Sequence, residues 1–329
     1  MHFYCATCNK QYPVGGLAYE CECGGLFKLH RDKDETIGDS VSLGEVKTPL
    51  LARRLDGIDL LLKADYLSPT GSFKDRGAYA LINALKDAGI TEVVEDSSGN
   101  AGAAIAGYCA AAGIKCHIYL PEATSQGKIK QINAYKASVV KVPGSRDATA
   151  RAILQAAEST YYASHVYNPL FFEGTKSLAY EIYAEIGVPD TIVVPAGNGT
   201  MLLGIYIGFK EIGQLPQIIA VQSASCAPVY AAFHGLTPGE VSPTAAEGIA
   251  VGQPKRLAEM VAAVRESGGT FLAVDDASVL RAQELLGEMG LYIEATSGAA
   301  VAGALEYFKN GAAPGQKIVV PLTGTGLKK

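Results

Sequence analysis

The sequence predicts an α/β protein built on parallel sheets. From residue 60 to the C-terminus, short apolar runs with the length of buried strands alternate with alanine-rich segments of helical spacing. Glycine-rich turns follow several of these runs, where parallel sheets present free backbone N–H groups. With 329 residues, the chain is long enough for about two domains with a buried core. We therefore expect open parallel sheets with helices on both faces.

The N-terminal segment is of a different kind, because four of the seven cysteines lie in its first 23 residues. Cys5 and Cys8 are separated from Cys21 and Cys23 by twelve residues, and glycine pairs supply turns at two places where metal-binding knuckles need them. Four thiolates can enclose Zn²⁺, whose binding then supplies folding energy to a short segment. The Cys-x-Cys half is tighter than the usual Cys-x-x-Cys, so a structural zinc ribbon and a metal-free remnant both stay open.

The α/β pattern then continues in order through the rest of the chain. The predicted strands are 60–63, 92–95, 115–120, 139–142, 191–194, 217–221, 270–274 and 317–321. The predicted helices are 74–88, 102–112, 128–137, 148–159, 173–186, 201–212, 256–267 and 277–289. No short-period repeat interrupts the alternation, so a solenoid is not expected.

Charge and hydropathy exclude two classes of partner. The chain has 28 basic and 33 acidic residues, a net charge of −5, which gives no electrostatic footprint for nucleic acid. Two stretches, 101–115 and 192–209, approach membrane length, but the first ends at a lysine and a Pro-Ala-Gly-Asn-Gly turn breaks the second. No secretory signal is visible at the N-terminus, so we expect a cytoplasmic protein without a membrane partner.

The first motif with chemical content opens the helix predicted at 74–88. Ser72 is placed to cap that helix, and Lys74 then lies in its first turn. The positive end of the helix and partial desolvation favour a neutral, nucleophilic amine there, which can form a Schiff base. Taken alone, Lys74 is equally compatible with a surface lysine.

Three further turns follow predicted strands. The hydroxyls and N–H groups of residues 97–99 suit a carboxylate, and the Asn100 amide can hold a ring oxygen. The glycines of the turn at 195–200 let backbone N–H groups approach a phosphate, and Thr-Gly-Thr-Gly at 323–326 follows the last strand. The chain has no Gly-x-x-x-x-Gly-Lys motif, so a nucleotide P-loop is not expected.

Together these motifs resemble threonine synthase, a pyridoxal-phosphate enzyme of the tryptophan synthase β-like fold. The resemblance rests on Ser-Phe-Lys-Asp-Arg-Gly at 72–77, Ser-Ser-Gly-Asn at 97–100, the loop at 197–200 and Thr-Gly-x-Gly-Leu-Lys at 323–328. It covers nearly the whole chain and implies two open α/β domains behind a zinc-ribbon-like segment. The implied division is a ribbon at 1–35, a large cofactor-binding domain at 36–77 and 161–329, and a small domain at 78–160.

The resemblance also implies roles for the candidate residues and a homodimer. Lys74 is the Schiff-base lysine and proton shuttle, and Thr323 faces the pyridine nitrogen, which a hydroxyl leaves largely unprotonated. The implied cofactor-binding residues are Lys74, Asn100, Gly197, Asn198, Gly199, Thr200 and Thr323. The implied substrate-carboxylate residues are Ser97, Ser98 and Gly99. The implied reaction converts O-phospho-L-homoserine and water to L-threonine and phosphate.

The chain departs from the family pattern where the substrate's own phosphate is held. Phe171 occupies the position of an arginine, a loss worth on the order of 2–3 kcal/mol of phosphate binding. Ala101 replaces a threonine and Thr325 replaces a histidine. Lys176 or Lys128 is a candidate for the missing cation, although Lys128 is more typical of a solvated surface lysine. An alternative is therefore a β-elimination or β-replacement enzyme: a serine/threonine dehydratase, or a cysteate synthase using phosphoserine and sulfite.

Overall fold

The computed structural model describes residues 1–124, 126–144 and 146–328, and the chain forms two compact units. The first unit contains Met1–Glu45, Lys74–Gly174 and the C-terminal end of the chain, and the second contains Val46–Phe73 and Thr175–Leu327. The structure therefore groups residues 1–35 with the chain segment 74–174, whereas the sequence analysis set them apart as a separate segment.

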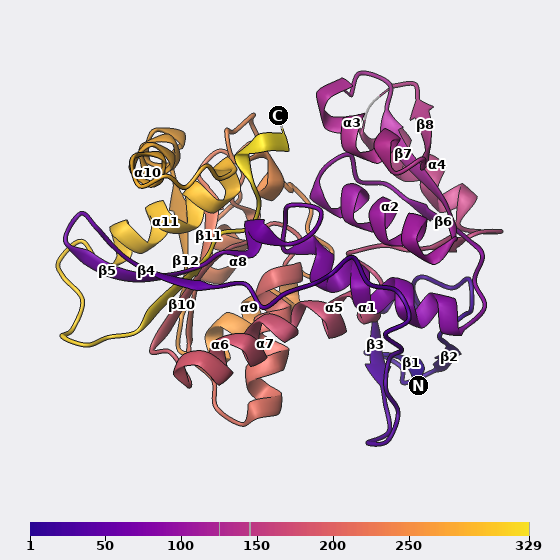
Figure 1. Ribbon diagram of the computed structural model, residues 1–329, viewed down its shortest axis with the longest axis horizontal. Helices are drawn as coiled ribbons and strands as arrows, with labels where there is room; N and C mark the ends of the chain where they lie inside the picture. Colours follow the sequence, from indigo (N-terminus) through magenta and orange to yellow (C-terminus); the bar gives the residue numbers. More distant parts are fainter. Residues whose placement is uncertain (125, 145, 329) are drawn as a thin grey trace. The chain divides into compact units, whose positions relative to one another are not determined.

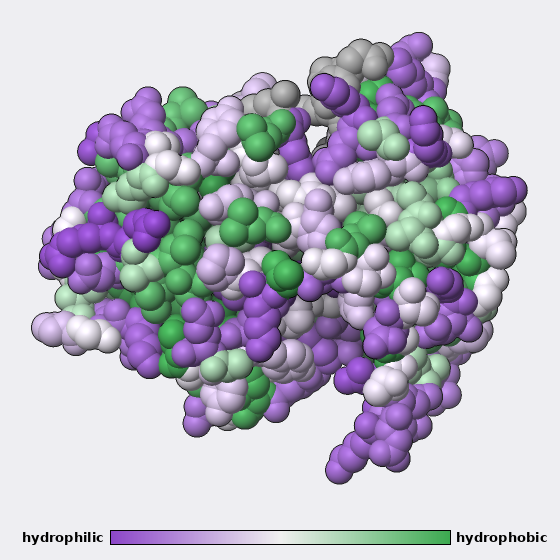
Figure 2. All heavy atoms as spheres, in the orientation of Figure 1, coloured by the Kyte–Doolittle hydropathy of each residue, from purple (hydrophilic) through white to green (hydrophobic). Residues whose placement is uncertain are grey.

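The first unit begins with a small antiparallel sheet. Its strands β1 (His2–Cys5), β2 (Gln11–Pro13) and β3 (Phe27–His30) are arranged in the order β2-β1-β3. The apolar side chains of this sheet belong to the same core as those of α1 and α2. Residues 31–34, which follow β3, are all exposed and charged, and Figure 2 shows this part of the surface as hydrophilic.

A parallel four-stranded sheet of order β8-β7-β6-β9 forms the rest of the first unit. Its strands are β6 (Glu92–Glu95), β7 (Lys115–Pro121), β8 (Ser138–Val142) and β9 (Tyr161–Tyr162). Its helices are α1 (Lys74–Asp87), α2 (Asn100–Ala112), α3 (Gln126–Ala134), α4 (Arg146–Ala156) and α5 (Pro169–Thr175). Adjacent residues of β6 face opposite sides: Val93 packs into the core with α1 and α2, and Val94 packs into the core with α4.

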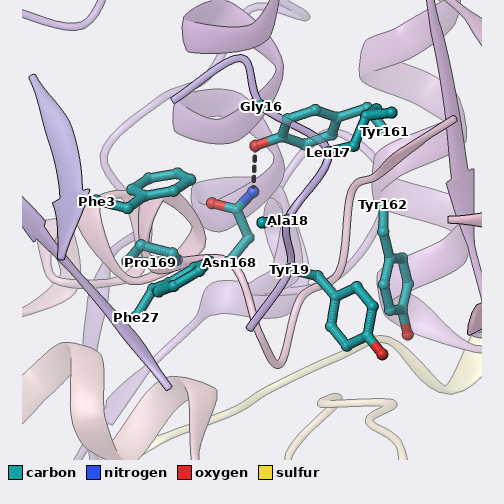
Figure 3. A pocket seen from close by; sticks show the side chains of 10 residues that line it. All are labelled: Phe3, Gly16, Leu17, Ala18, Tyr19, Phe27, Tyr161, Tyr162, Asn168 and Pro169. Atoms are coloured by element: carbon teal, nitrogen blue, oxygen red, sulfur yellow. Dashed lines mark hydrogen bonds between the residues drawn. The ribbon is translucent and has the colours of Figure 1, made fainter. Parts of the chain in front are cut away.

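The small sheet and the segment after β9 enclose an aromatic pocket (Figure 3). Phe3 and Phe27 line one part of it and Tyr161 another, and the Asn168 amide donates a hydrogen bond to the Tyr161 hydroxyl (2.8 Å). The same hydroxyl donates to the carbonyl oxygen of Val14 (3.0 Å). These contacts join the cysteine-bearing segment to the α/β part of the unit.

The second unit contains a six-stranded sheet of order β12-β11-β10-β13-β5-β4, parallel except for β4. Its strands are β4 (Leu50–Leu55), β5 (Ile58–Lys63), β10 (Thr191–Pro195), β11 (Gln217–Ser223), β12 (Thr270–Val274) and β13 (Ile318–Pro321). Its helices are α6 (Ser177–Ile186), α7 (Thr200–Ile212), α8 (Pro228–His234), α9 (Leu257–Glu266), α10 (Asp276–Glu288) and α11 (Ala295–Tyr307). Figure 1 shows α10 and α11 on one side of this sheet and α6, α7 and α9 on the other.

The predicted α/β architecture with parallel sheets is confirmed, but some elements differ. The helix predicted at 173–186 is two helices, α5 and α6, which meet at Lys176. Helix α11 was not predicted, because it is buried on nearly all sides and so lacks the polar face that marks an amphipathic helix. Within the described part of the chain, no helix combines the length and apolar character required to cross a membrane.

Candidate active site

Lys74 is the first residue of α1, as the sequence predicted. Its side chain is half-buried, and its Nζ lies 5.6 Å from the centroid of the Phe171 ring. The predicted capping role of Ser72 is wrong, because its Oγ is buried without a hydrogen-bond partner among the described residues. Helix α1 begins at Lys74, so Ser72 lies one residue before the N-cap position, and its backbone pairs with Gly324 in an isolated bridge.

Phe171 is fully buried against the backbone of α1. A Cβ atom on Gly77 would lie only 2.2 Å from Cε1 of the Phe171 ring, so the ring packs directly on the glycine. The edge of the His165 ring faces Phe171 at a centroid distance of 6.0 Å, and His165 Nδ1 lies 2.7 Å from Glu95 Oε1. Complete burial raises the pKa of Glu95 well above its usual value, and the charge of Lys74 opposes this effect.

The loop between β6 and α2 contains the predicted carboxylate-binding residues. Ser97 and Ser98 are half-buried and Gly99 is exposed, and the Gly99 N–H donates to Ser97 Oγ (3.3 Å). A Cβ atom on Gly102 would lie 1.8 Å from the carbonyl oxygen of Ser97. The loop therefore lies directly on the first turn of α2, where only glycine leaves enough space.

Asn100 is the first residue of α2, and its amide orientation is fixed by the C-terminal segment. Lys328 Nζ donates to Asn100 Oδ1 (3.0 Å). Because Oδ1 faces a cation, Nδ2 is the amide atom that can donate to an oxygen of a ligand. This orientation suits the predicted contact with a phenolic oxygen.

The loop at 197–200 joins β10 to α7 in the second unit. Gly197 is buried, Asn198 is half-buried, and Thr200 begins the helix. Gly199 has a φ of +83°, and a Cβ atom there would lie 2.6 Å from the sulfur of Met260. Both the backbone conformation and the close contact require glycine. The first turn of α7 contains no acidic residue, so its N–H groups form a suitable site for an anion.

Thr323 is buried two residues after the end of β13 and takes part in a hydrogen-bonded cluster. Its hydroxyl donates to Glu294 Oε1 (2.6 Å) and lies 2.9 Å from Ser297 Oγ. The backbone N–H of Thr323 donates to the same serine oxygen (2.8 Å). Glu294 is the residue before α11, and Ser297 lies in the first turn of that helix.

The candidate cation Lys176 and the replaced position Thr325 also have defined surroundings. Lys176 is buried, and its Nζ forms a 2.9 Å ion pair with Glu211 Oε1, which compensates the charge of the lysine. The N–H of Thr325 donates to the carbonyl oxygen of Gly71 (3.0 Å). The side chain of Lys128 lies outside the described part of the structure.

The four N-terminal cysteines lie together, with all Sγ atoms within 4.8 Å of one another. The Cys5–Cys23 and Cys8–Cys21 sulfur distances are both 3.5 Å. A tetrahedral zinc site with Zn–S bonds of about 2.3 Å requires sulfur atoms about 3.8 Å apart, close to these values. Burial raises the pKa of Cys5, but N–H donors of Cys8 and Thr7 outweigh it and lower the pKa to about 6. The geometry fits a structural zinc ion, with no position left open for catalysis.

Four polar residues near the predicted ones were not found from the sequence. They are Glu95, His165, Glu294 and Ser297. Glu95 does carry a recognisable signal, because it is a carboxylate at the end of an apolar strand and directly precedes the 97–100 loop. The others pair with residues distant in sequence, so no local pattern identifies them.

The donor set of the chain fits pyridoxal phosphate. A lysine at a helix start can form a covalent bond to an aldehyde, the α7 N-terminus suits a phosphate, and Asn100 Nδ2 suits a phenolic oxygen. The buried Ser72 hydroxyl, unpaired among the described residues, is a further polar atom near Lys74 in the chain.

Comparison with known proteins defines the class of enzyme. Residues 41–324 match the family described as pyridoxal-phosphate dependent enzyme, and the chain belongs to this family. It is therefore a pyridoxal-phosphate-dependent lyase with the tryptophan synthase β-like fold.

Individual relatives show which enzymes of this family the chain is similar to. The chain is 32% identical to threonine synthase of Methanocaldococcus jannaschii, covering 98% of this chain and 92% of that protein. It is 35% identical to threonine synthase of Synechocystis sp., covering 96% of this chain and 86% of that protein. Among solved structures, a threonine deaminase (T.th.) matches with a TM-score of 0.73 and 25% identity, covering 85% of this chain and 92% of that one.

Proposed function

We propose that this enzyme is a threonine synthase, which converts O-phospho-L-homoserine and water to L-threonine and phosphate. The observation that carries the proposal is the similarity to threonine synthase over 98% of the chain, which includes the four-cysteine segment. The reaction needs an amine that moves protons, a site for the substrate carboxylate and a site for the cofactor phosphate.

The chain's residues divide these tasks. Lys74 would hold the cofactor, and its Nζ would remove and return the proton at the substrate's α-carbon; the helix start favours the neutral form of the amine. Hydroxyl and N–H donors of Ser97, Ser98 and Gly99 orient the substrate carboxylate. When bound, pyridoxal phosphate withdraws electrons from the α-carbon, which makes these proton transfers possible.

The remaining predicted residues hold the cofactor. The N–H groups of Gly197, Asn198, Gly199 and Thr200 bind its phosphate at the start of α7. Asn100 donates to its phenolic oxygen, and Thr323 faces its pyridine nitrogen. For the substrate phosphate, Lys176 stays a candidate, but its ammonium must then exchange its ion pair with Glu211 for the phosphate.

Product analysis tests the proposal. The purified holoenzyme is incubated separately with O-phosphohomoserine, with O-phosphoserine plus sulfite, and with threonine, and products are separated by amino-acid chromatography. We expect threonine and one equivalent of phosphate from the first substrate. Cysteate or a 2-oxo acid from the other incubations, with no product from O-phosphohomoserine, would refute the assignment. Lys74→Ala provides the inactive control.

A second candidate is a β-elimination or β-replacement enzyme, such as a serine/threonine dehydratase or a cysteate synthase using phosphoserine and sulfite. The burial of Phe171 favours it, because an apolar ring stands where the family holds a phosphate with an arginine. The product analysis above separates the two candidates. If the enzyme is a threonine synthase, we expect Phe171→Arg to lower the KM for O-phosphohomoserine, and an unchanged KM in a folded variant means that another residue holds the phosphate.

We further propose a cytoplasmic homodimer without nucleic-acid or membrane partners. The net charge of −5 supports the absence of a nucleic-acid partner. Sedimentation equilibrium of the holoenzyme tests the dimer, which requires twice the 34.4 kDa mass of the chain.

A further inference from the structure

Two imidazole–carboxylate pairs lie at opposite ends of β6. Glu92, its first residue, pairs with His117, and Glu95, its last residue, pairs with His165; the nitrogen–oxygen distance is 2.7 Å in both pairs. The Glu92 pair lies at the surface, whereas Glu95 is fully buried. Ligands of parallel sheets bind beyond the carboxyl ends of the strands. Glu95 lies at that end of β6, two residues before the 97–99 loop.

The Glu95–His165 pair has the arrangement of a general base. A carboxylate oxygen can only accept, so ionised Glu95 takes the hydrogen of His165 Nδ1. In a neutral ring, Nε2 is then the atom that can take up a proton. The His165 side chain is 13% exposed and that of Glu95 is 0% exposed, so a ligand reaches the pair through His165.

Glu95 is also able to share a proton that the ring takes up. Its Oε2 has no hydrogen-bond partner among the described residues, although it is buried. Burial raises the pKa of Glu95, as do the charges of Asp96 and Cys116, whereas the charge of Lys74 lowers it. When Nε2 of His165 is protonated, the Nδ1 hydrogen can therefore move to Glu95 Oε1, and no buried pair of charges needs to form.

Lys74 and His165 border the same aromatic ring. Lys74 Nζ lies 5.6 Å from the centroid of the Phe171 ring, and the His165 ring centroid lies 6.0 Å from it. These residues and the 97–99 loop all belong to the first unit. In the proposed reaction Lys74 serves the α-carbon, and the water that adds at the β-carbon needs a proton acceptor of its own.

We propose that His165, positioned by Glu95, is the base that takes a proton from the water that adds to the β-carbon. The proposal rests on the proposed threonine synthase function, in which loss of phosphate leaves a double bond between the α- and β-carbons. The water oxygen forms a bond to the β-carbon while one of its hydrogens passes to His165 Nε2. The electron pair of the double bond moves to the α-carbon, where Lys74 Nζ delivers a proton. His165 then gives its proton to solvent, which balances the proton that the departing phosphate takes up.

The products formed from O-phosphohomoserine by the holoenzyme test the proposal. If water does not add, the unsaturated amino acid leaves the enzyme and hydrolyses to 2-oxobutyrate and ammonia, so each phosphate is matched by threonine or by 2-oxobutyrate. In His165→Gln the amide cannot take up a proton, and we expect the ratio of threonine to 2-oxobutyrate to fall about 100-fold. In Glu95→Gln the imidazole remains without its carboxylate, and the ratio should fall about tenfold or more. A general loss of activity does not change this ratio.

His117→Gln and Glu92→Gln are the matched controls. They remove the surface pair at the other end of β6, which has the same 2.7 Å separation. Both variants should keep the wild-type ratio of threonine to 2-oxobutyrate.

A wild-type ratio in both His165→Gln and Glu95→Gln overturns the proposal, and so does an equal fall in the two control variants. A fall in His165→Gln alone overturns the positioning role of Glu95. If His165→Gln does not fold, Glu95→Gln decides the outcome. If the wild type releases no phosphate from O-phosphohomoserine, the proposed function fails together with this inference; if it does release phosphate, an unchanged ratio refutes the inference alone.

Discussion

Gly102→Ala tests whether the 97–99 loop binds substrate, because the substitution acts on this loop through a single close contact. The added Cβ would lie 1.8 Å from the Ser97 carbonyl oxygen, whereas a separation under 3.0 Å is essentially never observed. The carbonyl must therefore move by about 1.2 Å, or the helix must shift by a similar amount.

Two effects of opposite sign determine the change in stability. Replacement of a helical glycine by alanine favours the helix by about 1 kcal/mol. Overpacking against backbone atoms costs about 1–3 kcal/mol, and the backbone carbonyl cannot rotate away as a flexible side chain does. We expect a net destabilisation of about 1 kcal/mol, which lowers the melting temperature by about 1–2 °C in a chain of this size.

The larger effect should be on catalysis. A displacement of about 1 Å in a group that orients substrate costs on the order of 100-fold in kcat/KM. Lys74 lies on a different helix, so covalent attachment of the cofactor should be retained. Steady-state kinetics, thermal unfolding and mass spectrometry after borohydride reduction measure the three quantities separately.

Gly287→Ala is the matched control. Gly287 is exposed in α10, and an added Cβ meets no atom within 4 Å. The same substitution should stabilise the protein by about 0.5–1 kcal/mol and leave kcat/KM unchanged. If Gly102→Ala matches this control in both melting temperature and kcat/KM, our account of the loop is wrong.

Three further predictions concern other parts of the chain. Lys74→Ala should abolish turnover and prevent covalent attachment of the cofactor, measured by mass spectrometry after borohydride reduction; an attached cofactor would place the bond on another lysine. Metal analysis should find one zinc ion per chain, which is lost in Cys8→Ser but not in Cys226→Ala. A wild-type protein without metal would indicate that the four-cysteine segment is a metal-free remnant of a zinc ribbon. Burial raises the pKa of Glu45, but the Leu43 N–H and the Ser42 and Tyr108 hydroxyls hold it below 4.5. Its ionised form therefore stabilises the fold above the unfolded-state pKa, and this contribution is lost as pH falls below about 4.5. Glu45→Gln should lower the melting temperature at pH 7, and the difference from the wild type should shrink as pH falls below the unfolded-state pKa; an equal loss at every pH would show that the charge of Glu45 does not matter.

Local signals were sufficient to predict the position of Lys74 at a helix start and the positions of the glycine loops. Lys74 follows a strand and a glycine-containing turn, and the turn at 195–200 requires glycine for its left-handed backbone at Gly199. Both features depend on residues that are neighbours in sequence, so a pattern of spacing reveals them. The four cysteines were predictable for the same reason.

Contacts between distant residues were not predictable. Thr323 and Glu294 are 29 positions apart, and Lys328 contacts Asn100 across 228 positions. The sequence predicted a role for Thr323 and Asn100, but the partner that orients each hydroxyl or amide is determined by the fold. The sequence likewise identified Phe171 as an unusual residue without showing that it packs on Gly77.

The position of β13 in the second sheet has a consequence for biosynthesis. This strand lies between β10 and β5, and it pairs Val319 with Leu61, 258 residues earlier in the chain. At about 5–20 residues per second, the ribosome synthesises β13 on the order of 10–50 s after β5. The strands and helices of the first unit are complete by Thr175, so this unit can fold while the second is still being synthesised. A nascent chain that stops a dozen residues early would lack β13 and leave the facing edges of β10 and β5 unpaired. Unpaired strand edges are prone to aggregation, so the chain should depend on chaperones until β13 has been synthesised.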